Sequence, residues 1–168
     1  MEPYQGSAVQ KAEDYLLKLP ELEAYLVGNW LTDLANFSAF VFHSVPRLNW
    51  AGFYLFDGAK LTLGPFVGKP ACTEIKVGRG VCGTAFEKGH ALLVPDVHEF
   101  PGHIACDSAS RSELVIPVIV DGVTCGVLDL DSPELARFSE ADRVGLTLWL
   151  GALTAKVPAA TWKKQPWR

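Results

Sequence analysis

The sequence predicts an α+β fold in which a central antiparallel β-sheet is flanked by helices. Two segments read as β-hairpins, because apolar residues surround an Asp-Gly pair at positions 57–58 and again at 121–122. Stretches with helical spacing stand before, between and after these hairpins, which disfavours a regular βαβ repeat. The chain has 168 residues, of which 49% are hydrophobic, and is long enough to bury one core without disulfide staples. We therefore expect one domain with helices on one side of the sheet.

Two helices are expected before the first strand. Apolar residues recur at helical spacing over residues 8–19 and again from 20 to about 45. Pro20 is expected to begin the second helix, because proline is tolerated in a first helical turn, where its missing N–H leaves no hydrogen bond unmade. The chain then divides into an N-terminal helical segment at 1–19, the main domain at 20–157 and a C-terminal tail at 158–168.

The later elements follow from the same kinds of signal. A hairpin is expected over residues 49–66, and a helix over 81–88 directly after a glycine-rich turn. A short strand should end at Pro95, and the second hairpin should occupy residues 112–133. The last helix should begin after Ser139, which caps its first turn, and the acidic residues there favour the positive end of a helix.

Charge and hydropathy exclude several classes of protein. The net charge is −4 and no Lys/Arg cluster runs through the body of the sequence, which gives no support for a nucleic-acid partner. The basic tail at 161–168 is expected to be solvated. The N-terminus lacks the apolar segment of a signal peptide, and the longest apolar run, at 114–120, is too short to span a membrane. We expect a cytoplasmic protein with no membrane partner.

Four cysteines raise the question of redox chemistry. Cys125 lies in a strand where a small hydrophobic residue would serve, so we expect it to fill the core. Cys72 and Cys106 lie in irregular segments with Gly and Pro, where reactive groups concentrate, and two loop thiols that meet can form a reversible disulfide. Cys82 stands between small residues. In a reducing compartment, such thiols indicate catalysis, redox sensing or metal binding.

A zinc site is the alternative use of these thiols. A Cys3His set would consist of Cys72, Cys82, His103 and Cys106. Structural zinc sites normally contain a Cys-x2-4-Cys knuckle, whereas nine residues separate the first two cysteines here. The spacing therefore disfavours zinc.

Three acidic residues are expected to meet at one end of the second hairpin. Asp129 and Asp131 are two residues apart, so their side chains point to the same face of the strand. Counting outward from the turn at 121–122 places Glu113 opposite about Leu130, with both aspartates beside it. Such a cluster suits a ligand ammonium group, and crowding should raise at least one pKa so that this acid can donate a proton.

The aromatic residues of the first hairpin add a wall to this site. Trp50 and Tyr54 are candidates for contacting a small organic cation, whereas Phe53 is expected to pack in the core.

A thiol beside acids is a poor nucleophile for acyl transfer, but it suits attack on an S=O group, whose oxygen must be protonated to leave as water. The sulfenic acid so formed condenses with a second thiol, and an external dithiol regenerates the pair.

The segments that build this site resemble those of a known family. “NWAGFY”, “GPFVGKPACTEI”, “GRGVCGTA”, “VPDVHEFPGHIACDSASRSELVIPV” and “GVLDLDSP” are similar to segments of the free methionine-R-sulfoxide reductases, small enzymes with a GAF fold. The resemblance covers about residues 25–155. It implies reduction of free methionine-R-sulfoxide and recycling by thioredoxin, with no metal and no bound cofactor. Members of the family are often dimeric, so a homodimer is among the partners that the resemblance allows.

The resemblance also implies a role for each site residue. Cys106 matches the thiol that attacks the sulfoxide sulfur, Cys72 the principal resolving cysteine, and Cys82 a third, alternative resolving thiol. The residues that hold the substrate and assist polarisation of its S=O bond are Glu113, Asp129 and Asp131, and those that enclose its methyl-sulfoxide end are Trp50 and Tyr54.

A GAF sensor is the competing class of function. Such a module would bind a small ligand or report redox state through a regulatory disulfide, without turnover. The sequence contains no separate output domain and no coiled-coil linker helix, which favours the enzyme. A sensor would show one stoichiometric oxidation, whereas an enzyme would consume reductant continuously.

Overall fold

The computed structural model describes residues 9–10, 12–104 and 106–164 and contains one six-stranded antiparallel sheet in the order β3-β2-β1-β6-β5-β4. The strands are β1 (Trp50–Phe56), β2 (Leu61–Gly68), β3 (Glu74–Ile75), β4 (Leu92–Val94), β5 (Ser112–Val120) and β6 (Val123–Ser132). The helices are α1 (Ala12–Glu23), α2 (Trp30–Ser44), α3 (Gly80–Lys88), α4 (Glu140–Lys156) and α5 (Ala159–Lys164), with a 3-10 turn η1 (Val97–Glu99). Both expected hairpins, β1–β2 and β5–β6, are confirmed.

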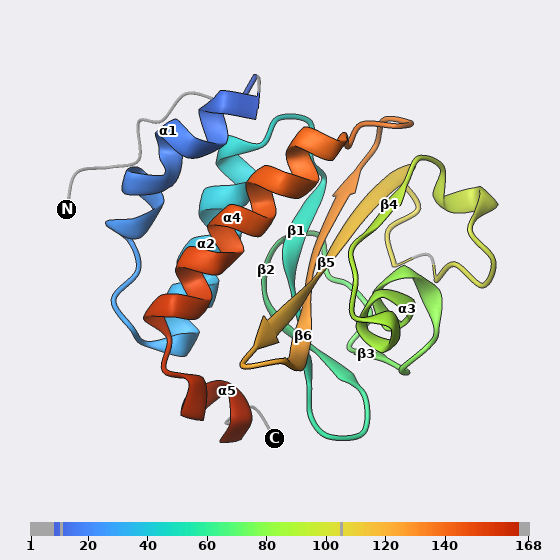
Figure 1. The fold of residues 1–168 in the computed structure, drawn as a ribbon. Helices are drawn as coiled ribbons and strands as arrows, with labels where there is room; N and C mark the ends of the chain where they lie inside the picture. Colours follow the sequence, from blue (N-terminus) through green and yellow to red (C-terminus); the bar gives the residue numbers. More distant parts are fainter. Residues whose placement is uncertain (1–8, 11, 105, 165–168) are drawn as a thin grey trace.

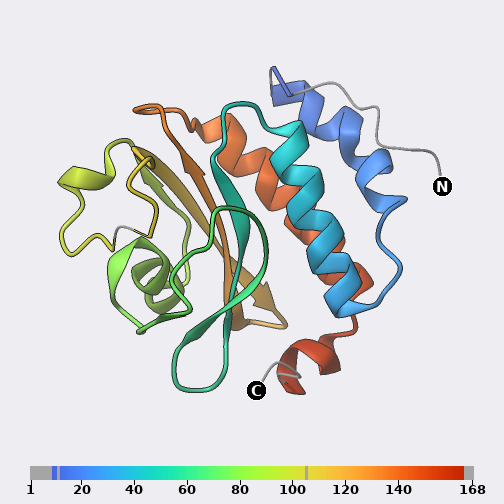
Figure 2. The same ribbon diagram turned by 180° about the vertical axis from the view of Figure 1, so that it is seen from behind.

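Helices cover both faces of the sheet, as Figures 1 and 2 show. α1, α2 and α4 lie on one face and enclose the larger core, which includes Phe37, Phe53 and Trp149. α3 lies on the other face and packs on a smaller core with Trp50 and Tyr54. The expectation that the helices share one side is therefore wrong for α3, because the second face of the sheet is also apolar and must be covered.

The first helix does not end at its proline. α1 continues through Pro20, and the break falls at residues 24–29. Gly28 has a φ of 86°, which favours glycine, and the side chain of Asn29 caps α2 by accepting a hydrogen bond from a backbone amide. The expectation that Pro20 begins a second helix is therefore wrong, because the Gly-Asn pair sets the boundary instead.

The C-terminal segment is better packed than its composition suggests. α5 carries Trp162, which is only 1% exposed and joins the larger core. Burying a large aromatic side chain contributes about 2 kcal/mol or more to folding. The expectation of a solvated tail is therefore wrong at Trp162, while residues 165–168 lie outside the described residues.

The start of the last long helix agrees with the sequence. Ser139 caps α4 and forms a capping box with Asp142, so two backbone amides without an intrahelical partner gain hydrogen bonds.

No helix within the described ranges is both long and apolar enough to cross a membrane.

The register of the second hairpin differs by one residue from the register counted from its turn. The pairing shifts between Val118 and Ile119, where Cys125 of β6 is the extra residue of a β-bulge. Beyond the bulge, Glu113 lies directly opposite Asp131 rather than one residue away. This correction brings two carboxyl groups face to face at the end of the sheet that holds the site.

Candidate active site

A pocket lies on the face of the sheet that α3 covers. Its walls come from β1, β5 and β6, from the start of α3, and from the loops at 69–71 and 103–110. It is partly open to solvent, and about 30 Å³ of it is available to the centres of water-sized molecules. Seven of the eight predicted site residues line it: Trp50, Tyr54, Cys82, Cys106, Glu113, Asp129 and Asp131.

The eighth residue is joined to this pocket by a disulfide. Cys72 is bonded to Cys106, and their Cα atoms are 5.4 Å apart, within the normal range. Tyr54 donates a 2.9 Å hydrogen bond to the backbone carbonyl of Cys72 and so holds this loop against the sheet. Cys82 and Cys125 are buried and belong to no disulfide in the described part of the chain. Of the pairings considered for Cys106, the structure contains the one with Cys72.

Strand alternation places the three acids on one face. Glu113 of β5 pairs with Asp131 of β6, and Asp129 lies two residues away on the same strand. The alternate residues Leu128 and Leu130 point into the larger core, as expected. Glu113 and Asp129 lie within the protein rather than at a solvated strand end, since each is 6% exposed, whereas Asp131 is half-buried.

Burial is the main influence on these carboxyl groups. It raises the pKa of Asp129 to about 6, and it raises the pKa values of Glu113 and Asp131 well above their ordinary values. The charge of Asp129 raises both of those pKa values further, while a hydrogen bond with Ser110 opposes the rise for Asp131. The interaction between the two carboxyl groups raises the pKa of Glu113 and lowers that of Asp129, which favours a protonated Glu113 beside an ionised Asp129. The cluster therefore offers both a proton and a negative charge near neutral pH.

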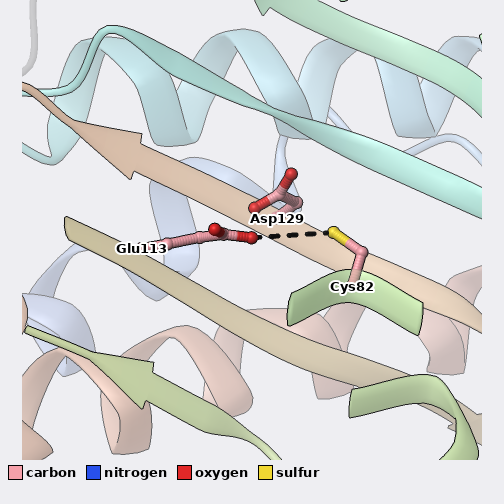
Figure 3. A group of neighbouring side chains, drawn as sticks. All are labelled: Cys82, Glu113 and Asp129. Atoms are coloured by element: carbon pink, nitrogen blue, oxygen red, sulfur yellow. Dashed lines mark hydrogen bonds between the residues drawn. The ribbon is translucent and has the colours of Figure 1, made fainter. Parts of the chain in front are cut away.

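Cys82 completes this cluster, as Figure 3 shows. Its Sγ lies 3.9 Å from Oε1 of Glu113, and the residue is 4% exposed. Burial raises the pKa of the Cys82 thiol well above its ordinary value, and the charges of Asp129 and Glu113 raise this pKa further. The thiol therefore keeps its proton at neutral pH and donates it to a carboxyl oxygen, which makes it a weak nucleophile in this state.

Three of these groups also meet a distance requirement for holding a cation. The ligand atoms of Cys82, Glu113 and Asp129 lie within 4.8 Å of one another. Metal binding would require a thiolate and two carboxylates, whereas burial raises the pKa values of Cys82 and Glu113 and so favours their protonated forms. The Cys3His zinc set does not form in this structure, because Cys72 and Cys106 are bonded to each other.

Trp50 and Tyr54 form an aromatic wall of the pocket. Their rings stack at a centroid distance of 5.9 Å, and Phe66 stacks on Trp50 at 5.2 Å, whereas Phe53 packs in the larger core as expected. Among the described residues, Nε1 of Trp50 and Oδ1 of Asp129 are buried without a hydrogen-bond partner. Because an unsatisfied buried polar group costs about 1–3 kcal/mol, an open donor and an open acceptor in one pocket indicate a site arranged for a polar ligand.

The loop that carries Cys106 is held by polar contacts that sequence reasoning missed. Asp107 accepts hydrogen bonds from the backbone amide of Ala109 at 2.9 Å and from Nδ2 of Asn49 at 3.1 Å, and it pairs with Lys69 at 3.4 Å. These partners, the Ala109 amide first, lower the pKa of Asp107. An aspartate followed by Ser-Ala-Ser is typical of an Asx turn, which was the available local signal. Asn49 and Lys69 are distant from Asp107 in sequence, so no local pattern predicts their contacts with it.

Asp129 should make the ligand-free protein less stable as the pH rises. Because its folded-state pKa of about 6 exceeds the ordinary value of 3.8, the folded state holds this proton more tightly than the unfolded state. The stabilisation is complete below the ordinary pKa and is lost as the pH rises through about 6. We expect Asp129→Asn to raise the free energy of unfolding at about pH 8 by on the order of 2 kcal/mol, and far less at about pH 4.

Urea unfolding at both pH values would check this expectation, and an equal gain at both would contradict it. The matched control is Asp96→Asn. Asp96 is partly exposed, and hydrogen bonds from His98 lower its pKa rather than raise it. That variant should therefore give no gain at either pH.

The chain is similar to proteins of a known family. Residues 31–148 match the model of the GAF domain. The chain is 51% identical over 141 residues to Protein YtsP of Bacillus subtilis, covering 82% of this chain and 86% of that one. It is 43% identical over 158 residues to a protein of Escherichia coli named free methionine-R-sulfoxide reductase, covering 93% and 96% of the two chains.

A solved structure agrees with this likeness. It is the free methionine-R-sulfoxide reductase from Neisseria meningitidis in complex with its substrate, and it matches with a TM-score of 0.89 and 41% identity over 97% of this chain and 99% of that one. The match confirms the GAF fold that the resemblance implied. The chain therefore belongs to the GAF domain family, among the relatives of the free methionine-R-sulfoxide reductases.

Proposed function

We propose that this protein reduces free methionine-R-sulfoxide to methionine with its own thiols. The observation that carries the proposal is the pocket itself, in which a pair of loop cysteines stands beside three acids, two of them buried and Asp131 half-buried. The acids hold at least one proton near neutral pH, which is what the oxygen of a sulfoxide needs. Relatives at 41% and 43% identity carry the name of this activity.

The pocket offers a partner for each end of such a substrate. The ionised Asp129, with Asp131 beside it, attracts the ammonium group, and Trp50 and Tyr54 enclose the methyl-sulfoxide end. The disulfide-bonded structure corresponds to the state after reaction, in which the Cys72–Cys106 bond ties together two of the loops that form the pocket walls. Reduction of this bond releases these loops from each other, and the substrate enters the reduced protein.

The chemistry divides into two steps. The thiolate of Cys106 attacks the sulfoxide, whose oxygen takes a proton from Glu113. The S=O bond breaks, the oxygen passes to Cys106 as a sulfenic acid, and methionine leaves with its sulfur reduced by two electrons. The thiol of Cys72 then attacks the sulfenic sulfur, so that water leaves and the Cys72–Cys106 disulfide forms.

The cycle closes when an external dithiol reduces this disulfide. Cys72 and Cys106 are both partly exposed, so a second protein can reach them. We assign the reduction to thioredoxin, whose potential of about −270 mV suits the task. The need to return these thiols to the reduced form in each turnover supports a location in the cytoplasm, where such reductants act.

The test is the consumption of NADPH with thioredoxin and thioredoxin reductase, using the separate R and S epimers of free methionine sulfoxide. Continuous consumption with the R epimer alone is expected. If neither epimer supports consumption by folded protein with reduced thiols, the enzyme proposal is wrong. A single stoichiometric oxidation would then favour the redox-sensor alternative.

Cys72→Ser should separate the two chemical steps. The variant keeps the attacking thiol and the acids, so it should release about one methionine per enzyme molecule in a rapid first turnover. Its later turnover should fall by about tenfold or more, because the sulfenic acid has lost its principal partner. Quantifying methionine against time, with and without thioredoxin, checks both parts.

The matched variant for this experiment is Cys82→Ser, which removes the other thiol near the pocket. The raised pKa of Cys82 makes it a poor resolving group, so continuous turnover should persist in this variant. Full turnover of Cys72→Ser together with loss in Cys82→Ser would reverse the assignment.

A further inference from the structure

His103 occupies a position in the pocket that the proposed chemistry does not yet use. It lies on the same loop as Cys106, three residues earlier, and lines the pocket with it. Its Nε2 is 3.8 Å from Oε2 of Glu113. The loop that carries the attacking thiol therefore also brings an imidazole ring to the acid that protonates the substrate.

The contact is not an ordinary ion pair. Burial lowers the pKa of His103, with a smaller lowering from the charge of His98, while burial raises the pKa of Glu113. At neutral pH a neutral ring therefore stands beside a protonated carboxyl group, with one proton available to the two. A distance of 3.8 Å is longer than a hydrogen bond, and such contacts in ligand-free sites are often long and shorten when substrate binds.

Among the neighbours of Glu113 compared below, His103 lies nearest to the solvent-exposed side of the pocket. On the inner side lie Cys82 at 3.9 Å and Asp129, both buried. The side chain of His103 is 16% exposed, against 8% for that of Glu113. The charged and titratable groups that act on the ring or share its pocket come from several elements. They are Glu113 of β5, Asp129 and Asp131 of β6, Tyr54 of β1, Cys82 of α3, Arg79 directly before α3, His98 of η1, Asp107 of its own loop and Lys69 before β3.

Each turnover requires a proton to return to Glu113, and His103 lies next to this residue. Each reduction takes one proton from Glu113 and releases one from the Cys106 thiol as it becomes a thiolate, so the net balance is zero only if a proton returns to Glu113. We propose that His103 is the proton relay and positioning residue that returns this proton to Glu113. The inference rests on the proposed function. The ring accepts the proton at one nitrogen and passes one on from the other, and no electrons move in this step.

His103→Gln tests the relay, because glutamine keeps a polar side chain but carries no transferable proton. The enzyme is supplied with thioredoxin, thioredoxin reductase and NADPH, and methionine formed from free methionine-R-sulfoxide is measured in the first turnover and in the steady state between about pH 6 and about pH 9. The first turnover should stay near the wild-type rate, because Glu113 already holds its proton. The steady-state rate should fall by about 10- to 100-fold relative to wild type, and the deficit should widen with rising pH. KM should change by less than about twofold, and added imidazole should restore part of the rate.

The matched control is His90→Gln, which makes the same change in an exposed histidine that lies outside the pocket and does not act on the pKa of His103. It should behave as wild type. A wild-type steady-state rate for His103→Gln at every pH would overturn the relay, and so would a pH-independent loss that imidazole does not restore. If His103→Gln does not fold, His103→Asn gives the same comparison. A wild-type enzyme that forms no methionine would contradict the proposed function itself, which is seen before any variant is compared.

Discussion

Replacing Cys106 by serine should abolish turnover of free methionine-R-sulfoxide, to less than about one-thousandth of the wild-type rate. A hydroxyl group cannot form the sulfenic acid on which the cycle depends, because its oxygen does not accept a second oxygen from the sulfoxide. The fold should survive, since Cys106 lies in a partly exposed loop. Methionine formation in both the first turnover and the steady state measures the effect.

Cys125→Ser is the matched control for this variant. Cys125 lies at the bulge of β6 within the larger core, on the face of the sheet opposite the pocket. Its replacement should lower stability modestly and leave the turnover of the folded protein intact. Substantial activity of Cys106→Ser would show that another thiol attacks the sulfoxide, and the assignment would then move to Cys82 or Cys72.

Cys106 and Cys125 differ in burial, and the sequence around each predicts this difference. Cys106 stands in a polar loop with glycine and proline, while Cys125 stands in an apolar strand, and local composition distinguishes the two environments. Cys82 was harder to interpret. It sits in a glycine-rich helix start like a reactive thiol, but the structure buries it against Glu113 and Asp129, and that contact joins three separate elements.

The fold was also predicted where its signals are local, and not where they depend on residues distant in sequence. The hairpins and the cap at Ser139 depend on neighbouring residues, so their signals are local and were predicted. The exact partner of Glu113 was not, because the bulge at Cys125 changes the register without a residue pattern that marks it. The burial of Trp162 also escaped, since it depends on a core built mainly from distant helices.

Glu113→Gln should lower kcat by about 100-fold or more, the usual loss when a general acid is removed. Glutamine has nearly the shape of the protonated acid and still donates an N–H to Asp129, so the pocket and the fold are expected to persist. What it lacks is a proton that can pass to the sulfoxide oxygen. KM should change little, because Asp129 and Asp131 still attract the ammonium group. Steady-state kinetics with the R epimer, together with first-turnover methionine formation, measures both parameters.

The pH dependence supplies the sharper criterion for Glu113. Its pKa is raised well above the ordinary value, so the wild-type rate should fall at alkaline pH as the carboxyl group loses its proton. The variant has no such group, and its low rate should lack that decline. Glu99→Gln, an exposed position in η1, should match wild type. If Glu113→Gln kept the alkaline decline, the proton would come from elsewhere, and Asp131, the other acid with a strongly raised pKa, would be the candidate to substitute next.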